Sequence, residues 1–211
     1  MNKIILIGGA PTVGKSFIAR KISEELRLPW VSTDGIREMM RKVVRREDFP
    51  ELFHFYDKEI NAKEYLTTHT PGQIVASQNK ESVGVWKGVK AIIDTDYVWK
   101  NYIVEGVAVV PKLVGKIDPS KHDIKPIFLI DENEERIREV VYTRGVWDSA
   151  HTYPDDVKEV EVQWVVLFNK YIKKEAGKYG YRVYQIDNRI NKRESFVDSL
   201  IKELRLWLEK G

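Results

Sequence analysis

The fold of this chain is indicated most strongly by the segment Gly9-Ala10-Pro11-Thr12-Val13-Gly14-Lys15-Ser16 (GAPTVGKS). It matches the pattern G-x-x-x-x-G-K-[ST] at every defined position. The apolar run Ile4-Ile5-Leu6-Ile7 comes just before it, and apolar residues spaced four apart, Ile18 and Ile22, come just after it. A buried strand, a glycine-rich turn and an amphipathic helix in this order are the setting of a phosphate-binding loop, or P-loop. We therefore expect this segment to bind a nucleoside triphosphate.

Each part of the loop has a physical task. The glycines let backbone N–H groups turn toward a phosphate, and the helix N-terminus adds partial positive charge. We expect Lys15 to reach the β- and γ-phosphates as a catalytic cation, and Ser16 to offer its hydroxyl to Mg²⁺. The predicted cofactors are thus ATP and Mg²⁺, and the predicted nucleotide contacts are Gly9, Pro11, Thr12, Val13, Gly14, Lys15, Ser16 and Phe17.

The rest of the chain alternates short β-rich runs with segments of helical period. Its 211 residues suit one domain. Strands are expected at residues 3–8, 29–33, 102–107, 124–130 and 181–186. This alternation is typical of a parallel sheet with helices on both faces. Together with the P-loop, it predicts an α/β fold with strand order 2-3-1-4-5, as in nucleoside monophosphate kinases.

Two segments depart from simple alternation. Residues 36–98 are predicted to form a helical, acceptor-binding insertion, with a turn at Pro71-Gly72 and a helix over 80–93. Residues 144–154 are predicted to form a lid. Three helix starts are predicted from polar capping residues followed three positions later by an acid, at Asp131, Thr152 and Asn191.

Composition excludes several classes of protein. The chain has no cysteine, which excludes a disulfide scaffold, a thiolate zinc site and a cysteine nucleophile. The 35 Lys and Arg against 32 Asp and Glu leave a net charge of +3, too even to indicate nucleic-acid binding. The basic run from Arg41 through Arg46 is interpreted as a solvated helix face. No apolar run approaches a membrane span, so we expect a cytoplasmic protein, and the many Lys and Glu residues favour a thermophilic source.

Other positions distinguish among P-loop proteins. The nearest match to the guanine motif N-K-x-D is Asn191-Lys192-Arg193-Glu194, which ends in the wrong acid. The third strand ends in a single acid, Glu105, followed by Gly106, rather than in the acidic pair of motor ATPases. The segment Ser32-Thr33-Asp34-Gly35-Ile36-Arg37 instead favours a kinase, because an acid after the second strand faces the γ-phosphate across the cleft.

These residues supply candidates for the acceptor side. Asp34 is predicted to accept or orient the acceptor hydroxyl proton, the alternative being a plain N-cap. Arg37 and Arg41 lie four apart, so both are expected to face an anionic acceptor. Glu105, with Gly106, is expected to contact the acceptor hydroxyl or to hold Mg²⁺ through a water. For each, the alternative is an ordinary structural or solvated side chain.

Arginines after the fourth strand are candidates for charge neutralisation during transfer. Arg144 borders the predicted lid and is the predicted catalytic arginine. Arg138 is predicted to contact the nucleotide, although a surface ion pair with Glu134 is an equal alternative.

The chain resembles the archaeal-type 2-phosphoglycerate kinases over most of its length. Residues 8–16 resemble that family's nucleotide loop, and STDGIREMMR at residues 32–41 resembles its S-T-D-x-I-R-E segment. EGVAVVP at residues 105–111 is similar to its E-G-V-H-x-x-P, with Ala108 where a histidine is usual. The resemblance implies that Lys15 and Ser16 serve ATP and Mg²⁺, and that Asp34 and Arg37 face the acceptor.

The function expected from all of this is ATP-dependent phosphorylation of a small anionic hydroxy compound, with 2-phosphoglycerate as one candidate. The alternatives are a nucleotide-sensing module that transfers no phosphate and a polynucleotide 5′-hydroxyl kinase. Neither a nucleic-acid partner nor a membrane partner is expected.

Overall fold

A five-stranded parallel sheet forms the centre of the computed structural model, which describes residues 2–53, 61–95, 97–145, 150–187 and 190–210. The strand order is β2-β3-β1-β4-β5, which confirms the predicted order. All four strand pairings are parallel. The strands are β1 (Asn2–Gly9), β2 (Trp30–Ser32), β3 (Asn101–Glu105), β4 (His122–Ile130) and β5 (Val183–Gln185).

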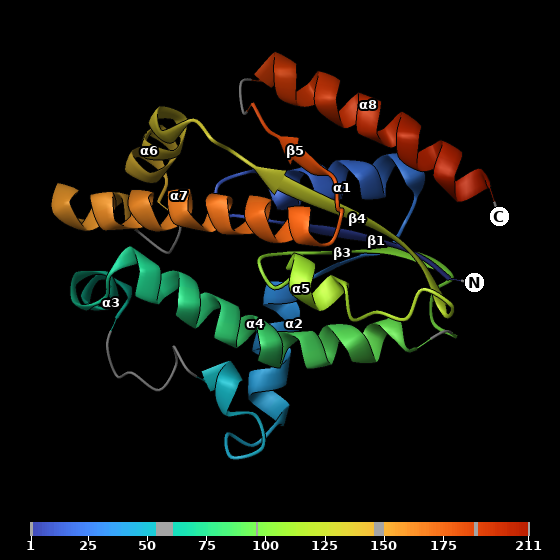
Figure 1. Cartoon of the computed structure of the whole chain (residues 1–211), viewed down its shortest axis with the longest axis horizontal. Helices are drawn as coiled ribbons and strands as arrows, with labels where there is room; N and C mark the ends of the chain where they lie inside the picture. Colours follow the sequence, from blue (N-terminus) through green and yellow to red (C-terminus); the bar gives the residue numbers. More distant parts are fainter. Residues whose placement is uncertain (1, 54–60, 96, 146–149, 188–189, 211) are drawn as a thin grey trace.

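Helices cover both faces of this sheet (Figure 1). On one face, α1 (Lys15–Leu26) packs beside α8 (Ile190–Glu209). The other face is covered by α4 (Pro71–Ile93), α5 (Pro111–Val114) and α7 (Asp155–Lys178), and α6 (Glu134–Thr143) packs on α7. Cover on both faces explains why β1 is continuously apolar, with Ile4, Ile5, Leu6 and Ile7 all fully buried.

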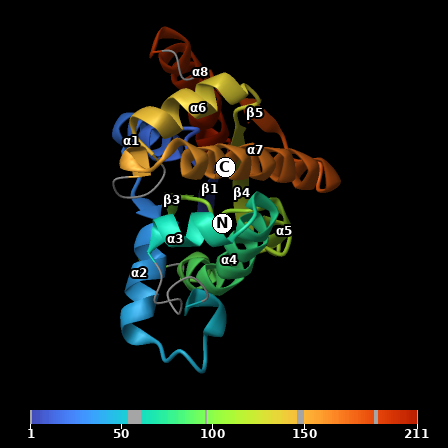
Figure 2. The same ribbon diagram turned by 90° about the vertical axis from the view of Figure 1, so that its left-hand side faces the viewer.

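The expected insertion after β2 is helical. It contains α2 (Thr33–Val43), the 3₁₀ turn η1 (Pro50–Phe53), α3 (Ala62–Thr68) and α4. Figure 2 shows α2, α3 and α4 on the side of the sheet opposite α8. A Cβ atom at Gly88 of α4 would lie 2.5 Å from Met40 Sδ and 2.7 Å from Ile36 Cγ2, so α2 and α4 cross in close contact through this glycine.

The predicted turn at Pro71-Gly72 is wrong. Helix α4 begins there, because Pro71 in the first turn has no N–H to leave unsatisfied. The hydroxyl of Thr70 accepts from the Gln73 N–H, and the Gln73 side chain accepts from the Thr70 N–H at 2.8 Å. Because of this capping box, the helix begins nine residues before Lys80, the residue at which the apolar periodicity predicted its start.

The predicted helix starts are shifted by a few residues. Asn133 caps α6 by accepting from the Arg136 N–H at 2.8 Å. Asp131 does not cap this helix, because its carboxylate receives the Arg136 guanidinium at 2.6 and 3.1 Å. Helix α7 follows Pro154 rather than Thr152, and α8 begins before Asn191.

The close approach of the chain at the end of β1 yields a stability prediction. A Cβ atom at Gly8 would lie 2.0 Å from the Val109 carbonyl oxygen, whereas one at Gly72 would meet nothing within 4 Å. Gly8→Ala should therefore lower the free energy of unfolding by about 1–3 kcal/mol. Gly72→Ala should change it by less than about 1 kcal/mol, in the stabilising direction. Urea unfolding measures both, and equal midpoints would contradict the close approach.

Candidate active site

The P-loop backbone has the conformation that anion binding requires. Thr12 and Gly14 have positive φ angles of 71° and 80°. Gly14 is the N-cap of α1, and no side chain caps the helix there. The first N–H groups of α1 therefore remain available for a phosphate at the helix's positive end.

Lys15 lies beneath this loop with only 8% of its surface exposed. Its ammonium donates to the Ala10 carbonyl at 2.7 Å. Burial lowers the pKa of Lys15, and the charge of Arg144 lowers it further, while Glu105 and Asp34 oppose the shift. Lys15 is thus electrostatically coupled to three charged residues that the sequence placed in catalysis or metal binding, namely Glu105, Asp34 and Arg144.

Glu105 ends β3 directly beside the P-loop. It is 2% exposed, and it accepts a hydrogen bond of 3.1 Å from the Ser16 hydroxyl. Burial raises the pKa of Glu105, although Lys15 and the Ser16 hydroxyl oppose this shift. A hydroxyl and a carboxylate at hydrogen-bonding distance form an oxygen donor set of the kind that Mg²⁺ prefers, so the residues present fit the expected metal.

Gly106 lets β2 and α2 approach this strand end. It has a φ of 142°, and a Cβ atom there would lie 1.8 Å from Thr33 Oγ1. Only glycine fits here, so Gly106 has a steric task, while its contact with substrate stays a prediction. Within the described chain, no group of three His, Cys, Asp or Glu residues could hold a metal by itself.

Asp34 and Arg37 enter the same pocket from α2. Ser32 caps this helix by accepting from the Asp34 N–H at 3.2 Å, so the Asp34 carboxylate is not consumed as the N-cap. Arg37 Nη1 lies 3.2 Å from Asp34 Oδ1. Both residues line the pocket together with Lys15, Ser16 and Glu105.

Arg41 does not line this pocket. Its Nε donates to the Leu52 carbonyl at 2.8 Å, and its two other nitrogens contact Glu38 at 2.9 Å and Glu81 at 2.5 Å. The helical spacing placed Arg37 and Arg41 on one face, as predicted. The expectation of two arginine forks facing an acceptor is not met, because the buried Glu81 carboxylate of α4 draws Arg41 away.

Of the two candidate arginines after β4, one lies at the pocket and the other does not. Arg144, at the C-cap of α6, lines the pocket. Arg138 lies outside the lining, and it pairs with Glu134 at 2.8 Å and with Glu159 at 2.7 Å, the surface alternative left open by the sequence. In the predicted lid, residues 146–149 lie outside the described residues, and η2 covers Ala150–Thr152.

Sequence reasoning missed six residues that line this pocket: Gln78, Val107, Val140, Thr143, Trp164 and Arg193. The Arg193 guanidinium lies 4.0 Å from the centre of the Phe17 ring, and no sequence signal joins these distant positions. Gln78 and Trp164 approach from α4 and α7. Gln78 carried a usable signal, because it is polar on the stripe of α4 that also carries the buried Ile74 and Val85.

The cavity enclosed by these residues has a volume of about 530 Å³, within the range of small-molecule sites. A larger cavity of about 770 Å³ lies at the opposite edge of the sheet, beside Asn2 and His122, and contains none of the predicted site residues.

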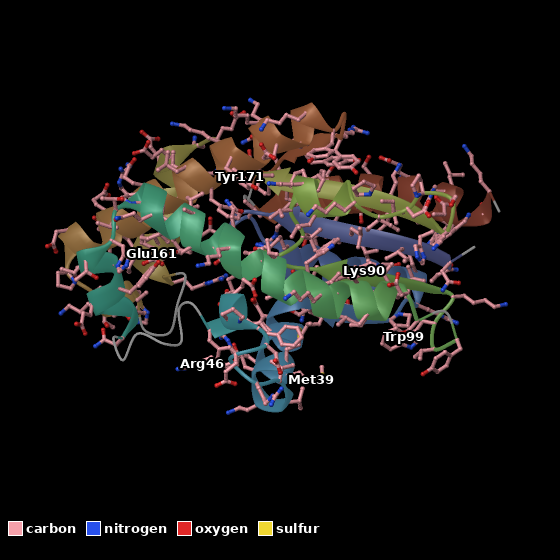
Figure 3. All side chains as sticks on the ribbon, turned by 60° about the horizontal axis from the view of Figure 1, so that its bottom comes forward. Met39, Arg46, Lys90, Trp99, Glu161 and Tyr171 are labelled. Carbon is pink, nitrogen blue, oxygen red and sulfur yellow. The ribbon has the colours of Figure 1, made fainter. Side chains whose placement is uncertain are left out.

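The basic run at residues 41–46 lines neither of these two cavities. Figure 3 shows Arg46 and the exposed Met39 on the outer part of the insertion.

Several known proteins with similar sequences carry the same activity in their names. The 2-phosphoglycerate kinase of Methanothermobacter thermautotrophicus is 30% identical over 220 residues, which cover 99% of this chain and 68% of that protein. The chain belongs to the 2-phosphoglycerate kinase family. The Pyrococcus furiosus relative is 32% identical over 99% of this chain and 67% of its own length. The Pyrococcus horikoshii relative is 37% identical over 75% and 53%.

This kinase family shares its fold with enzymes of very different sequence. No protein-family model matches the chain. Shikimate kinase from Acinetobacter baumannii superposes with a TM-score of 0.55 at 11% identity, covering 100% of this chain and 96% of its own. Shikimate kinase from Aquifex aeolicus gives 0.51 at 14% identity, covering 99% of both. Among the described residues, no helix is long and apolar enough to cross a membrane.

The buried Glu105 carboxylate yields a prediction with a defined pH dependence. Because its pKa is raised in the folded protein, the ionised form destabilises the fold at neutral pH. Glu105→Gln should therefore raise the free energy of unfolding of the nucleotide-free protein at pH 7 by about 0.5–2 kcal/mol. The gain should fade as the pH falls and be lost below about 4.3, where the wild-type Glu105 carboxyl is mostly protonated in both the folded and the unfolded state.

Thermal unfolding from pH 4 to 8 measures this effect. Glu132→Gln is the control, because Glu132 is exposed and pairs only with the exposed Lys173 among the described residues. A Glu105→Gln variant that is less stable than wild type at pH 7 would contradict the assignment.

Proposed function

We propose that this protein transfers the γ-phosphate of ATP to a hydroxyl group of a small anionic acceptor, with 2-phosphoglycerate as the first candidate. One observation carries the proposal. A single cavity is lined by the P-loop residues Lys15 and Ser16 and, across from them, by Asp34 and Arg37. The names of the relatives, which are 2-phosphoglycerate kinases, support the choice of acceptor.

On the donor side, the N–H groups of the P-loop and of the first turn of α1 would bind the triphosphate. Lys15 would neutralise charge on the β- and γ-phosphates, and its burial strengthens that interaction. Ser16 and, through water, Glu105 would hold Mg²⁺. The metal would supply neutralisation of the charge that develops between the β- and γ-phosphates.

On the acceptor side, the hydroxyl oxygen would attack the γ-phosphorus as the bond from that phosphorus to the bridging oxygen of ADP breaks. Asp34 would take the hydroxyl proton, since its carboxylate is 60% exposed and lines the cavity. Arg37 would bind the acceptor's anionic group and hold the hydroxyl in line. Arg144 would stabilise the charge on the transferring group.

The deciding experiment is a screen of hydroxy acids and their phosphate esters for ATP-dependent phosphorylation. We expect 2-phosphoglycerate to be converted. Lys15→Ala should reduce kcat at least 100-fold while leaving the unfolding transition in place. Lys173→Ala, which removes an exposed lysine paired with Glu132, should leave kcat unchanged.

Other outcomes of this screen would point elsewhere. Tight ATP binding with no phosphorylated product would indicate a nucleotide sensor, and labelling of a 5′-hydroxyl oligonucleotide would indicate a polynucleotide kinase. Undiminished activity of Lys15→Ala would overturn the proposal.

Arg144 and Arg138 provide a matched pair of variants. Arg144→Ala should lower kcat by about 10²–10³-fold, because it removes a cation that lines the cavity. Arg138→Ala removes the same group six residues earlier, where its ion partners are Glu134 and Glu159, and kcat should stay within about threefold of wild type. Steady-state assays at saturating ATP measure both. Equal losses would contradict the roles assigned to the two arginines.

A further inference from the structure

The buried carboxylate of Glu81 lies between the two arginines of α2. Glu81 projects from α4 and is 2% exposed. Its Oε1 accepts from Arg41 Nη2 at 2.5 Å, and its Oε2 lies 3.5 Å from Arg37 Nη1. Neither Glu81 nor Arg41 lines the cavity, whereas Arg37 does. The buried Glu81 carboxylate therefore joins the acceptor arginine to an arginine outside the site, and the exposed Glu38 carboxylate also contacts both arginines.

Some N–H donors of Arg37 have protein partners among the described residues and others do not. Its Nε donates to Glu38 at 3.0 Å, and its Nη1 faces Asp34 at 3.2 Å and Glu81 at 3.5 Å. Its Nη2 donates no hydrogen bond to any residue that the structure describes. A guanidinium carries five N–H donors, so the two on Nη2 remain for a ligand.

Arg41, by contrast, is engaged at every nitrogen. Its Nε and Nη1 bind the Leu52 carbonyl and Glu38, and its Nη2 binds Glu81. The Leu52 carbonyl belongs to η1, so Arg41 ties α2 to η1 and α4 at once. Such a fixed guanidinium is suited to holding a carboxylate in place rather than to capturing a substrate.

The charges of Glu81, Arg37 and Arg41 depend on one another electrostatically. Burial raises the pKa of Glu81, and the charges of Arg37 and Arg41 oppose that shift. The carboxylate also raises the pKa of Arg37. Removing one member of a buried ion cluster leaves the others uncompensated, so the geometry of Arg37 depends on Glu81 and, through it, on Arg41.

We propose that Glu81 is a positioning residue for the acceptor: it fixes Arg37 so that Nη2 faces the anionic group of the acceptor, and Arg41 fixes Glu81. The inference rests on the proposed function in one respect, the anionic nature of the acceptor. It adds that acceptor affinity is set partly by two residues that never touch the acceptor, and that one guanidinium nitrogen, rather than two arginine forks, makes the contact.

The test is binding of 2-phosphoglycerate, by calorimetry, alongside steady-state kinetics. Glu81→Gln should weaken binding and raise the KM for 2-phosphoglycerate about tenfold, as expected for a disturbed charge-assisted hydrogen bond. The KM for ATP and kcat at saturation should stay within about threefold. Arg41→Met should produce the same pattern although Arg41 lies outside the cavity, and it is the second variant if Glu81→Gln does not fold.

A double-mutant cycle separates positioning from general stability. If Glu81 acts through Arg37, Arg37→Ala/Glu81→Gln should bind 2-phosphoglycerate no more weakly than Arg37→Ala alone. The control is Glu51→Gln. Glu51 lies on η1 and its Oε2 is 3.7 Å from the Lys87 ammonium of α4, so this variant disturbs the same helix without touching either arginine. It should leave acceptor binding unchanged.

The outcomes distinguish this inference from the proposed function. Wild-type binding of 2-phosphoglycerate without phosphate transfer would overturn the function but leave the Glu81 comparison valid. Unchanged binding in Glu81→Gln and Arg41→Met, or losses that add in the cycle, would overturn the inference alone. Failure of the wild type to bind 2-phosphoglycerate would overturn both.

Discussion

Two opposite charges, those of Lys15 and Glu105, are buried close together at the carboxyl edge of the sheet. Each charge is costly to remove from water. Burial therefore lowers the pKa of Lys15 and raises the pKa of Glu105, which favours the neutral form of both groups. The chain offsets this cost with the Ala10 carbonyl, the Ser16 hydroxyl and the attraction between the two charges. The central pairing of β1 with β3 creates the proximity, because Ile7 is opposite Glu105 in the parallel register.

The glycines of this region follow from the same crowding. Gly8 passes against the Val109 carbonyl, and Gly106 passes against the Thr33 side chain. Both strand ends therefore approach neighbouring segments more closely than any side chain would permit. The chain that follows β2 is thereby brought over the P-loop, where α2 presents Asp34 and Arg37. The acceptor residues are thus placed by steric contacts made at the strand ends.

Much of this could be predicted because it is encoded locally. The P-loop, the order of the strands and the grouping of Lys15, Ser16, Asp34, Arg37 and Glu105 follow from short motifs and from the shared edge of parallel strands. The directions of Arg41 and Arg138 could not be predicted in the same way. Helical spacing identifies which side chains share a face. It does not identify the carboxylate on another helix with which such a side chain forms an ion pair. The start of α4 was predicted wrongly for a related reason. A Pro-Gly pair can form a loop turn or the first turn of a helix, and here the capping residue Thr70 makes it the first turn of α4.

The stacking of Arg193 on Phe17 has a consequence for how the protein is made. Phe17 belongs to the first helix and Arg193 to the last, so the wall they form joins segments separated by almost the entire chain. During synthesis the phosphate-binding loop leaves the ribosome early, well before its partner on α8 exists. Domains begin to fold as their segments emerge. The pocket therefore gains this wall only after α8 has emerged and docked. Full nucleotide affinity would then appear late in translation, as a property of the finished domain.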